Sequence, residues 1–387
     1  MTVGPLRVIE TARIFIMKRS ISVFWIVALL LVCACGPAGG SVEAAGASPS
    51  VFGVSEAGPS EPARTDAPTP TPFATPEPNS TDTPAPTHTP APSDTPEPIA
   101  TDTPQPSPAY TYTLAWFTDT QIMMSHYRKM LPAYNAMCRW VADHAEDHNI
   151  VAFLHTGDMV DTATSRGQWD NFSRGMEVIA EKMPLFVTLG NHDFYDSTVR
   201  YVWKEQFFFK NIPEERRFRD GQASYMELSV GSTDLLFIQL AFREKNNLTA
   251  IQWLRNVCNA HADRTVIFVV HAYLTNDGRL MEAAKIMERE LVSQCPNIRL
   301  IVCGHSRGIA RQDFPYDDDG DGVTDRTVHV LMHDLQLDRE RYGYLNLLTF
   351  DPEANTLSVD SYAPFYDDYI YDDENPDAER FTIENVF

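Results

Sequence analysis

The sequence has little positive charge and no pair of cysteines at C-x-x-C spacing. Among its 387 residues, 31 are Lys or Arg and 53 are Asp or Glu, so the formal net charge is −22 at pH 7. Proteins that bind nucleic-acid backbones need clustered Lys and Arg, and this charge therefore predicts no nucleic-acid partner. The six cysteines form no C-x-x-C pair, which argues against a zinc knuckle or a thioredoxin-like redox motif. A disulfide between Cys258 and Cys295 and buried free thiols are both open at this point.

The chain also lacks an apolar run of the length that spans a bilayer. Its apolar stretch from Ile21 to Ala34 is too short for that and follows Lys18 and Arg19, which is the pattern of an export signal. The stretch ends in LVCACG, a sequence that resembles the cleavage box of bacterial lipoproteins with Cys35 as the lipidated residue. An ordinary secretory signal is the alternative.

We therefore expect residues 1–35 to be a signal peptide, with Met17 as an alternative start. The protein should be lipid-anchored at the cell membrane and face the extracellular side, or be secreted. Proline is scarce after this region except in one segment, because 16 of the 27 prolines lie between Pro59 and Pro108 and only eight follow Tyr110. Residues 36–110 are thus predicted to be a Pro/Thr-rich disordered linker, and residues 111–387 the folded domain.

Within residues 111–387, short apolar runs alternate with amphipathic segments. Helical spacing of apolar residues predicts helices over 126–148, 167–182, 249–260 and 281–293. Two alternating segments, 223–230 and 234–240, predict an antiparallel hairpin, and the end of the chain is rich in strands up to Tyr362. The acidic stretch from Asp367 to Glu379 is expected to be a solvated tail. This order of elements predicts an α/β domain with two packed sheets flanked by helices.

Five polar motifs each follow an apolar run that is typical of a buried strand. In chain order they contain the following residues: Asp119 and Gln121; Asp158 and Asp161; Asn191 and His192; His271; His305 and Arg307. Side chains placed just past strand ends converge at one edge of a sheet. Carboxylates, amide oxygens and imidazoles are ligands of divalent ions, and a pair of such ions activates water against a phosphoester.

In these motifs the chain resembles the calcineurin-like metallophosphoesterase superfamily, most specifically in Gly-Asn-His-Asp at 190–193. The resemblance implies a four-layer αββα sandwich of two mixed sheets flanked by helices. It implies an enzyme that hydrolyses a phosphate ester by in-line attack of a metal-bound hydroxide. Two divalent ions, Mn, Fe, Zn or Mg, would be its cofactors, a phosphoester its substrate, and a monomer its expected state.

The resemblance also assigns a role to each matching residue. Asp119 would bind the first metal and Asp158 would bridge both. Asn191, His271 and His305 would bind the second metal. His192 would stabilise or protonate the leaving oxygen, and Asp161 would hold its ring.

Two departures from the superfamily pattern fall on the first metal. Gln121 stands where a histidine is usual, and a glutamine oxygen can replace an imidazole as a neutral donor. Arg307 stands where the second histidine of Gly-His-x-His is usual, and arginine keeps its proton and cannot be a ligand. The first site should therefore bind its ion more weakly and suit Mn²⁺ or Mg²⁺ better than Zn²⁺.

Arg307 leaves two functions open. Its guanidinium could clamp the substrate phosphate through two hydrogen bonds, which would make it part of the catalytic machinery. Alternatively, the first site is degraded and the protein is a catalytically silent binder at the cell surface.

A second motif, separate from the first five, places carboxylates at alternate positions. Its residues match the order of ligands in a calcium loop: Asp317, Asp319, Asp321, the carbonyl of Val323, and Asp325. Position 12 is Val328 instead of the glutamate of an EF-hand, so the motif resembles an exported Asp-x-Asp-x-Asp-Gly loop. The sequence predicts a calcium ion here, with an acidic surface turn as the alternative.

Overall fold

The computed structural model of the chain describes residues 110–194, 209–336, 341–369 and 376–387. The predicted signal peptide, the lipidated Cys35 and almost all of the predicted linker lie outside these residues. In the part of the chain that is described, no helix is long and apolar enough to cross a membrane.

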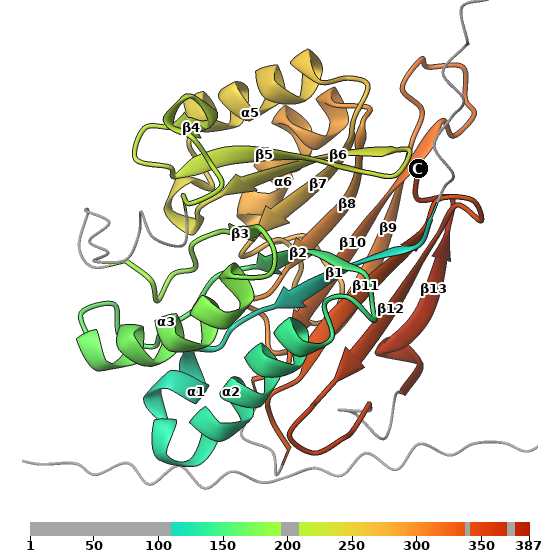
Figure 1. Cartoon of the computed structure of the whole chain (residues 1–387). Coiled ribbons are helices and arrows are strands. Elements are labelled where there is room, and N and C mark those ends of the chain that lie inside the picture. The colour runs from blue at the N-terminus through green and yellow to red at the C-terminus, as the bar shows by residue number, and fades with distance from the viewer. Residues whose placement is uncertain (1–109, 195–208, 337–340, 370–375) are drawn as a thin grey trace, which may run out of the picture. The chain divides into compact units, whose positions relative to one another are not determined.

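Two sheets form the centre of the domain (Figure 1). The six-stranded sheet has the order β13-β12-β11-β1-β2-β3, with β1, β2 and β3 parallel and the other three strands antiparallel to their neighbours. Its strands are β1 (Tyr112–Phe117), β2 (Ile150–His155), β3 (Leu185–Val187), β11 (Leu345–Asp351), β12 (Thr356–Tyr362) and β13 (Arg380–Glu384).

The seven-stranded sheet has the order β4-β5-β6-β7-β8-β10-β9 and is also mixed. Strands β6, β7, β8 and β10 run parallel, whereas β4, β5 and β9 are antiparallel to their partners. Its strands are β4 (Arg217–Phe218), β5 (Ala223–Val230), β6 (Thr233–Leu240), β7 (Thr265–Val270), β8 (Ile298–Cys303), β9 (Gly308–Tyr316) and β10 (Arg326–Asp334).

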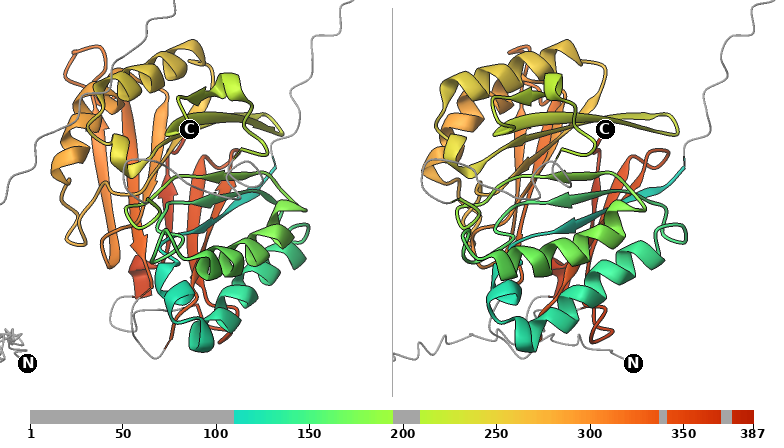
Figure 2. Two further views of the ribbon diagram at one scale, coloured as in Figure 1. Left: turned by 90° about the vertical axis from the view of Figure 1, so that its left-hand side faces the viewer. Right: turned by 60° about the vertical axis from the view of Figure 1, so that its left-hand side comes forward.

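Helices cover the outer faces of both sheets (Figures 1 and 2). On the side of the six-stranded sheet lie α1 (Gln121–Ser125), α2 (Tyr127–Asp143) and α3 (Arg166–Ala180), and on the other side lie α5 (Leu248–Ala260) and α6 (Glu282–Glu290). The predicted four-layer αββα sandwich is thus confirmed.

Alternation along the strands explains why two cores form. In β10, Leu331 packs into the core between the sheets, while its neighbours Val330 and Met332 pack into the core under α5 and α6. Successive strand residues point to opposite faces, so a strand with apolar residues at consecutive positions is buried on both sides.

Most differences from the predicted elements lie at strands of mixed polarity. Strands β9 and β13 were not predicted, because their exposed and half-buried residues give no apolar alternation. The expected solvated tail is partly wrong: Asp368 accepts a hydrogen bond from Tyr344 at 2.7 Å, and Glu379 is fully buried. Cys258 and Cys295 are both buried free thiols, so the alternative of a disulfide is not realised.

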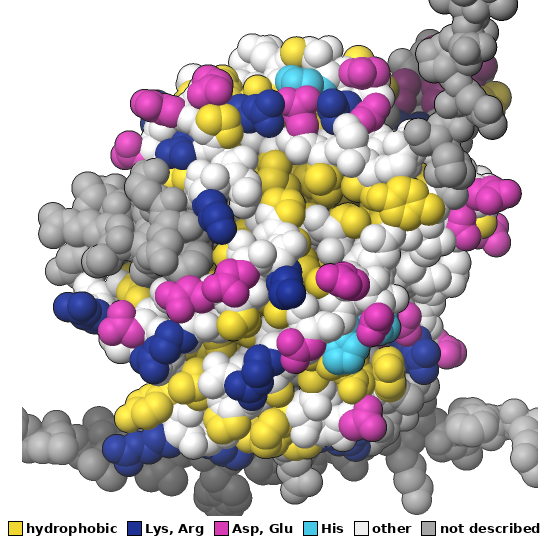
Figure 3. All heavy atoms as spheres, viewed as in Figure 1, with side chains coloured by type: hydrophobic (Ala, Val, Ile, Leu, Met, Phe, Trp, Pro, Cys, Tyr) yellow, Lys and Arg dark blue, Asp and Glu magenta, His cyan; other side chains and the backbone are white. Residues whose placement is uncertain are grey.

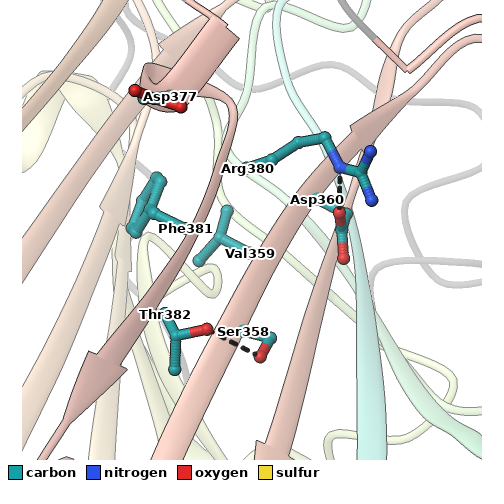
Figure 4. A pocket seen from close by; sticks show the side chains of 7 residues that line it. All are labelled: Ser358, Val359, Asp360, Asp377, Arg380, Phe381 and Thr382. Atoms are coloured by element: carbon teal, nitrogen blue, oxygen red, sulfur yellow. Dashed lines mark hydrogen bonds and ion pairs between the residues drawn. The ribbon is translucent and has the colours of Figure 1, made fainter.

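A shallow groove of about 470 Å³ lies over the outer strands β12 and β13 (Figure 4). An ion pair between Arg380 and Asp360, 2.8 Å long, crosses one end of it. Strand β11 separates these strands from β1, so the groove is remote from the parallel strand ends where the predicted ligands lie.

Candidate metal centre

The carboxyl ends of the parallel strands in both sheets lead into the loops that carry the predicted ligands. Asp119 follows β1, Asp158 follows β2, and Asn191 follows β3 in the six-stranded sheet. His271 follows β7 and His305 follows β8 in the seven-stranded sheet. The loops touch across the two sheets, since the amide of His305 donates to Oδ2 of Asp119 at 3.0 Å.

His271 is the centre of a tight group of ligand atoms. Its Nε2 lies 3.0 Å from Oδ1 of Asn191, 3.1 Å from Nδ1 of His305 and 3.4 Å from Oδ2 of Asp158. Its other ring nitrogen, Nδ1, lies 2.8 Å from the carbonyl oxygen of Thr156 and must donate to it. When the ring is neutral, the lone pair of Nε2 therefore points at atoms that also carry lone pairs.

Such a group is stable when a positive charge sits among its members. Burial disfavours a charged ring, yet the carboxylates of Asp158 and Asp119 raise the pKa of His271 to about 9. The pKa of His305, which follows β8, shifts in the opposite direction. Burial and the charge of His271 lower it to about 4. The donor set of Asn191, Asp158, His271 and His305 fits one divalent cation. These residues are those predicted for the second metal.

Next to this group lie the residues predicted for the first metal. Gln121 donates through Nε2 to Oδ2 of Asp158 at 3.1 Å. Its Oε1, and Oδ1 of Asp119, are buried and have no hydrogen-bond partner. A buried acceptor without a partner costs about 1–3 kcal/mol, and a cation between these oxygens would remove that cost. The residues present thus fit a second ion as well.

The backbone around the ligands adopts an uncommon conformation. Asp119, Asp158 and His305 have positive φ angles of 49°, 53° and 72°. Gly190 lies against the carboxylate of Asp158 so closely that any Cβ at position 190 would overlap it. Strained backbone of this kind clusters at functional sites, where the surrounding structure holds it in place.

Asp193, the last residue of Gly-Asn-His-Asp, organises this backbone. Its carboxylate accepts hydrogen bonds from the amides of Gly190, Asp158 and Met159 at 2.8–2.9 Å. Burial and the charge of Asp158 raise the pKa of Asp193 to about 7. The sequence motif contained this residue, but the prediction gave it no role.

His192 lies beside the ligand group without joining it. Its amide donates to Oδ1 of Asp158 at 2.8 Å, while its side chain is partly exposed. Ring atom Nδ1 lies 2.9 Å from the carbonyl oxygen of Asp161 and 3.7 Å from the carboxylate of that residue. The ring is therefore held by the backbone of Asp161 rather than by its carboxylate as predicted, because the backbone carbonyl is the nearer acceptor.

Arg307 is exposed two residues beyond His305. Asn276 donates to the backbone carbonyl of Arg307 at 3.4 Å, which fixes the loop. The guanidinium makes no hydrogen bond or ion pair with any residue that the structure describes. No described residue therefore neutralises the charge of Arg307, which lies two positions along the chain from His305.

Two residues of the turn after β6 join the site without having been predicted. The ring of Phe242 lies 5.6 Å from that of His271 and 5.4 Å from that of His305. Lys245 Nζ lies 3.5 Å from the centre of the Phe242 ring, and its charge also lowers the pKa of His305. No metal or phosphate motif covers this turn, so nothing in the sequence indicates that it belongs to the site.

A groove of about 380 Å³ lies between α1, the start of α2 and the start of α3. Gln168 lines it and accepts hydrogen bonds from the amides of Asp161 and Thr162 at 2.9 Å. The groove therefore adjoins the loop that orients His192. On the face of the domain in Figure 3, acidic and basic side chains are interspersed instead of gathering in one patch.

The predicted calcium loop lies on the surface between β9 and β10. One carboxylate oxygen from each of Asp317, Asp319 and Asp325 lies within 4.8 Å of the others. Asp321 is not part of this group, and all four carboxylates accept hydrogen bonds from backbone amides of the loop. The structure thus brings three of the four predicted carboxylates together.

Comparison with known proteins agrees with this geometry. A model of the family described as calcineurin-like phosphoesterase matches residues 112–306. The chain is 30% identical over 270 residues to the uncharacterized protein YvnB of Bacillus subtilis strain 168; the match covers 68% of the chain. The same match covers 20% of YvnB, so the chain spans about a fifth of the length of that relative.

A solved structure gives the same fold. Purple acid phosphatase PPD1 from seeds of yellow lupin, Lupinus luteus, superposes with a TM-score of 0.50 at 15% sequence identity. The superposition covers 73% of this chain and 55% of the phosphatase. The match of the family model over half of the chain, together with the ligand loops at the strand ends, shows that this protein belongs to the calcineurin-like phosphoesterase family.

Proposed function

We propose that this protein hydrolyses a phosphate ester with the help of two divalent ions held between the two sheets. One observation supports this above all: Asn191, Asp158 and His305 converge on the lone pair of His271 within 3.0–3.4 Å. The polar atoms without partners on Asp119 and Gln121 support a place for the other ion.

When bound, a pair of such ions activates water at neutral pH and withdraws charge from phosphoryl oxygens. Asp158 would contact both ions, as its position between Gln121 and His271 allows. Asp119 and Gln121 would hold the first ion, and Asn191, His271 and His305 the second. Neutral oxygen and carboxylate donors at the first site favour Mn²⁺ or Mg²⁺.

His192 would give a proton to the departing oxygen of the ester. Its Nδ1 donates to the carbonyl of Asp161, so the proton would leave from Nε2 on the opposite side of the ring. Arg307 would bind two phosphoryl oxygens through its guanidinium, since no described residue neutralises it. Water activated by the ions would attack phosphorus in line, opposite the oxygen that receives the proton from His192.

The test is hydrolysis of a chromogenic phosphomonoester and a phosphodiester by the purified protein with added Mn²⁺. We expect turnover that a chelator abolishes and that Mn²⁺ restores. The rival function, a silent surface binder on the same fold, predicts no turnover with any divalent ion although metal is bound at His271 and His305. Metal bound at His271 and His305 without hydrolysis would therefore favour the binder.

We also propose that the protein acts outside the cell, held by lipid on Cys35, and that residues 317–325 bind calcium. The export signal and lipoprotein-like box support the first point. The grouping of Asp317, Asp319 and Asp325 supports the second. Loss of membrane association on Cys35→Ala would support lipid anchoring, whereas unchanged membrane association would contradict it.

A further inference from the structure

The end of strand β10 adds a carboxylate to the metal centre that no motif indicates. Met332 of β10 pairs in parallel with Cys303 of β8, the residue before the Gly304-His305 turn. Asp334, two residues further on, therefore lies at the same edge of the sheet as His305. It is the last residue of β10, just as the other ligands follow the ends of parallel strands.

The surroundings of Asp334 leave its charge uncompensated. The side chain is fully buried, and it accepts hydrogen bonds from the amide of Gln336 at 3.4 Å and from Nε2 of the same residue at 3.2 Å. No Lys or Arg of the described residues pairs with it. The turn beside the end of β10 contacts Asp119 directly, because Gly304 packs against the carboxylate of Asp119 and the amide of His305 donates to its Oδ2 at 3.0 Å. A buried carboxyl group beside other carboxyl groups must either keep its proton or face a cation.

Buried oxygen atoms without hydrogen-bond partners indicate where such a cation would bind. Among the described residues, three buried carboxylate or amide oxygens have no hydrogen-bond partner: Oδ1 of Asp119, Oε1 of Gln121 and Oε1 of Gln336. Two of these belong to the first metal site. The third belongs to the residue whose other side-chain atom holds Asp334. All three unused acceptors thus lie on or next to the carboxyl groups of Asp119, Asp158 and Asp334.

We propose that Asp334 is a ligand of the first metal and replaces the imidazole that is absent at position 307, with Gln336 orienting it and offering a neutral oxygen alongside. This inference rests on the proposed function only in taking the site to be a two-metal centre. The first site then has the oxygen donors of Asp119, Gln121, Asp158 and Asp334. A site made of oxygen donors alone prefers Mn²⁺ or Mg²⁺ to Zn²⁺.

The experiment measures metal content, independently of turnover. Metal-free full-length protein is dialysed against Mn²⁺, and bound metal is counted by mass spectrometry. We expect two equivalents in the unmodified protein and one in Asp334→Asn, with the affinity of the first site lowered at least about tenfold. Asp360→Asn, which alters an ion pair far from the centre, is the matched control and should keep two equivalents.

Thermal unfolding separates a ligand from a purely structural carboxylate. Without metal, Asp334→Asn should be as stable as the unmodified protein or more stable, because it removes a buried charge beside Asp119. With Mn²⁺, the same variant should gain less stability than the unmodified protein does. A structural role predicts a loss of stability in both conditions, and that result would overturn the inference.

Restoring an imidazole provides the complementary test. The double variant Asp334→Asn with Arg307→His should regain the second equivalent of metal, since histidine returns a donor to the position that the family uses. Two equivalents in Asp334→Asn alone, or fewer than two in the unmodified protein, would also refute the assignment. Metal loss in Asp334→Asn would uphold it even if the unmodified protein hydrolysed no ester, so the two proposals fail separately.

Discussion

The carboxylate of Asp193 accepts a hydrogen bond from the backbone amide of Asp158 at 2.8 Å. The two residues belong to loops that follow different strands, β2 and β3. The same carboxylate also binds the amides of Met159 and Gly190. Asp158, which is proposed to bridge two cations, is therefore positioned through its backbone amide by Asp193, which is not proposed as a ligand.

Asp193→Asn should weaken both the fold and the metal centre. An amide nitrogen in place of one oxygen would face backbone N–H donors, leaving at least one buried donor without a partner. We expect a loss of about 1–3 kcal/mol in the free energy of unfolding. Urea denaturation of metal-free protein measures it, with Asp360→Asn as a surface control that should change by less than about 1 kcal/mol. Equal losses in both variants would contradict this role of Asp193.

His192→Ala should slow ester hydrolysis without changing the amount of bound metal. Because His192 contacts Asp158 through its amide and not its ring, bound metal should be unchanged. We expect kcat for esters with poor leaving groups to fall by about 10²–10⁴-fold, and less for p-nitrophenyl esters, whose leaving group needs no proton. The dependence of kcat on leaving-group pKa measures this. An equal loss for both kinds of ester would argue against a proton donor.

Arg307→Ala should reduce kcat/KM without altering metal content. Hydrogen bonds to charged groups contribute about 1.5–3 kcal/mol, which corresponds to a loss of about 10- to 100-fold. Arg307→Lys should retain only part of the kcat/KM of the unmodified protein, because an ammonium cannot form the two-pronged contact. Steady-state kinetics with metal counts on the same samples measure both quantities. Unchanged kcat/KM would remove Arg307 from the site.

Acid should destabilise the protein through His155. Burial and the charge of His271 lower the pKa of His155 to about 3, and its Nδ1 accepts a hydrogen bond from the amide of Gly157 at 3.1 Å. The folded pKa lies below the unfolded value, so this contribution is present above about pH 6.5 and is lost as the pH falls towards 3.

His155 is expected to contribute about 1.4 kcal/mol per pH unit to the slope in that window, in addition to His305 and His333, whose pKa values are lowered to about 4. Denaturation of metal-free protein between pH 4 and 7 measures it. His155→Asn, which cannot take up a proton there, should flatten the profile. An unchanged slope in this variant would exclude His155 as its source.

Calcium should stabilise the domain through the loop between β9 and β10. At a calcium concentration about a hundredfold above the dissociation constant, the gain should be about 2.7 kcal/mol, seen as a rise in Tm. Asp317→Asn should abolish the gain, because Asp317 belongs to the three grouped carboxylates. Asp360→Asn should keep it. If calcium did not raise the Tm of the unmodified protein, the loop would be an acidic surface turn and not a calcium site.

The sequence predicted the layers and the ligand loops because both depend on local patterns. Buried parallel strands such as Thr265–Val270 are continuous apolar runs, and the loops after them carry the ligand types that metals need. Asp334 was not predicted as a ligand because it is the last residue of β10 and has neither a neighbouring glycine nor a neighbouring ligand motif. Its role depends on the pairing of β10 with β8, which no local string encodes.

The orientation of His192 was beyond prediction for a different reason. Asp161 offers two acceptors, a carboxylate and a carbonyl, and the conformation of the loop decides between them. Phe242 and Lys245 lie in a turn between β6 and α5 that has the composition of any surface connection. They lie near His271 and His305 because β6, β7 and β8 are adjacent parallel strands of the seven-stranded sheet.

The left-handed backbone at Asp119, Asp158 and His305 carries a conformational cost that the surrounding packing must offset. Glycine at any of these three positions would lower that cost, but it would also remove the side chain that is proposed to hold an ion. Backbone comfort and ion binding are therefore opposed at these positions.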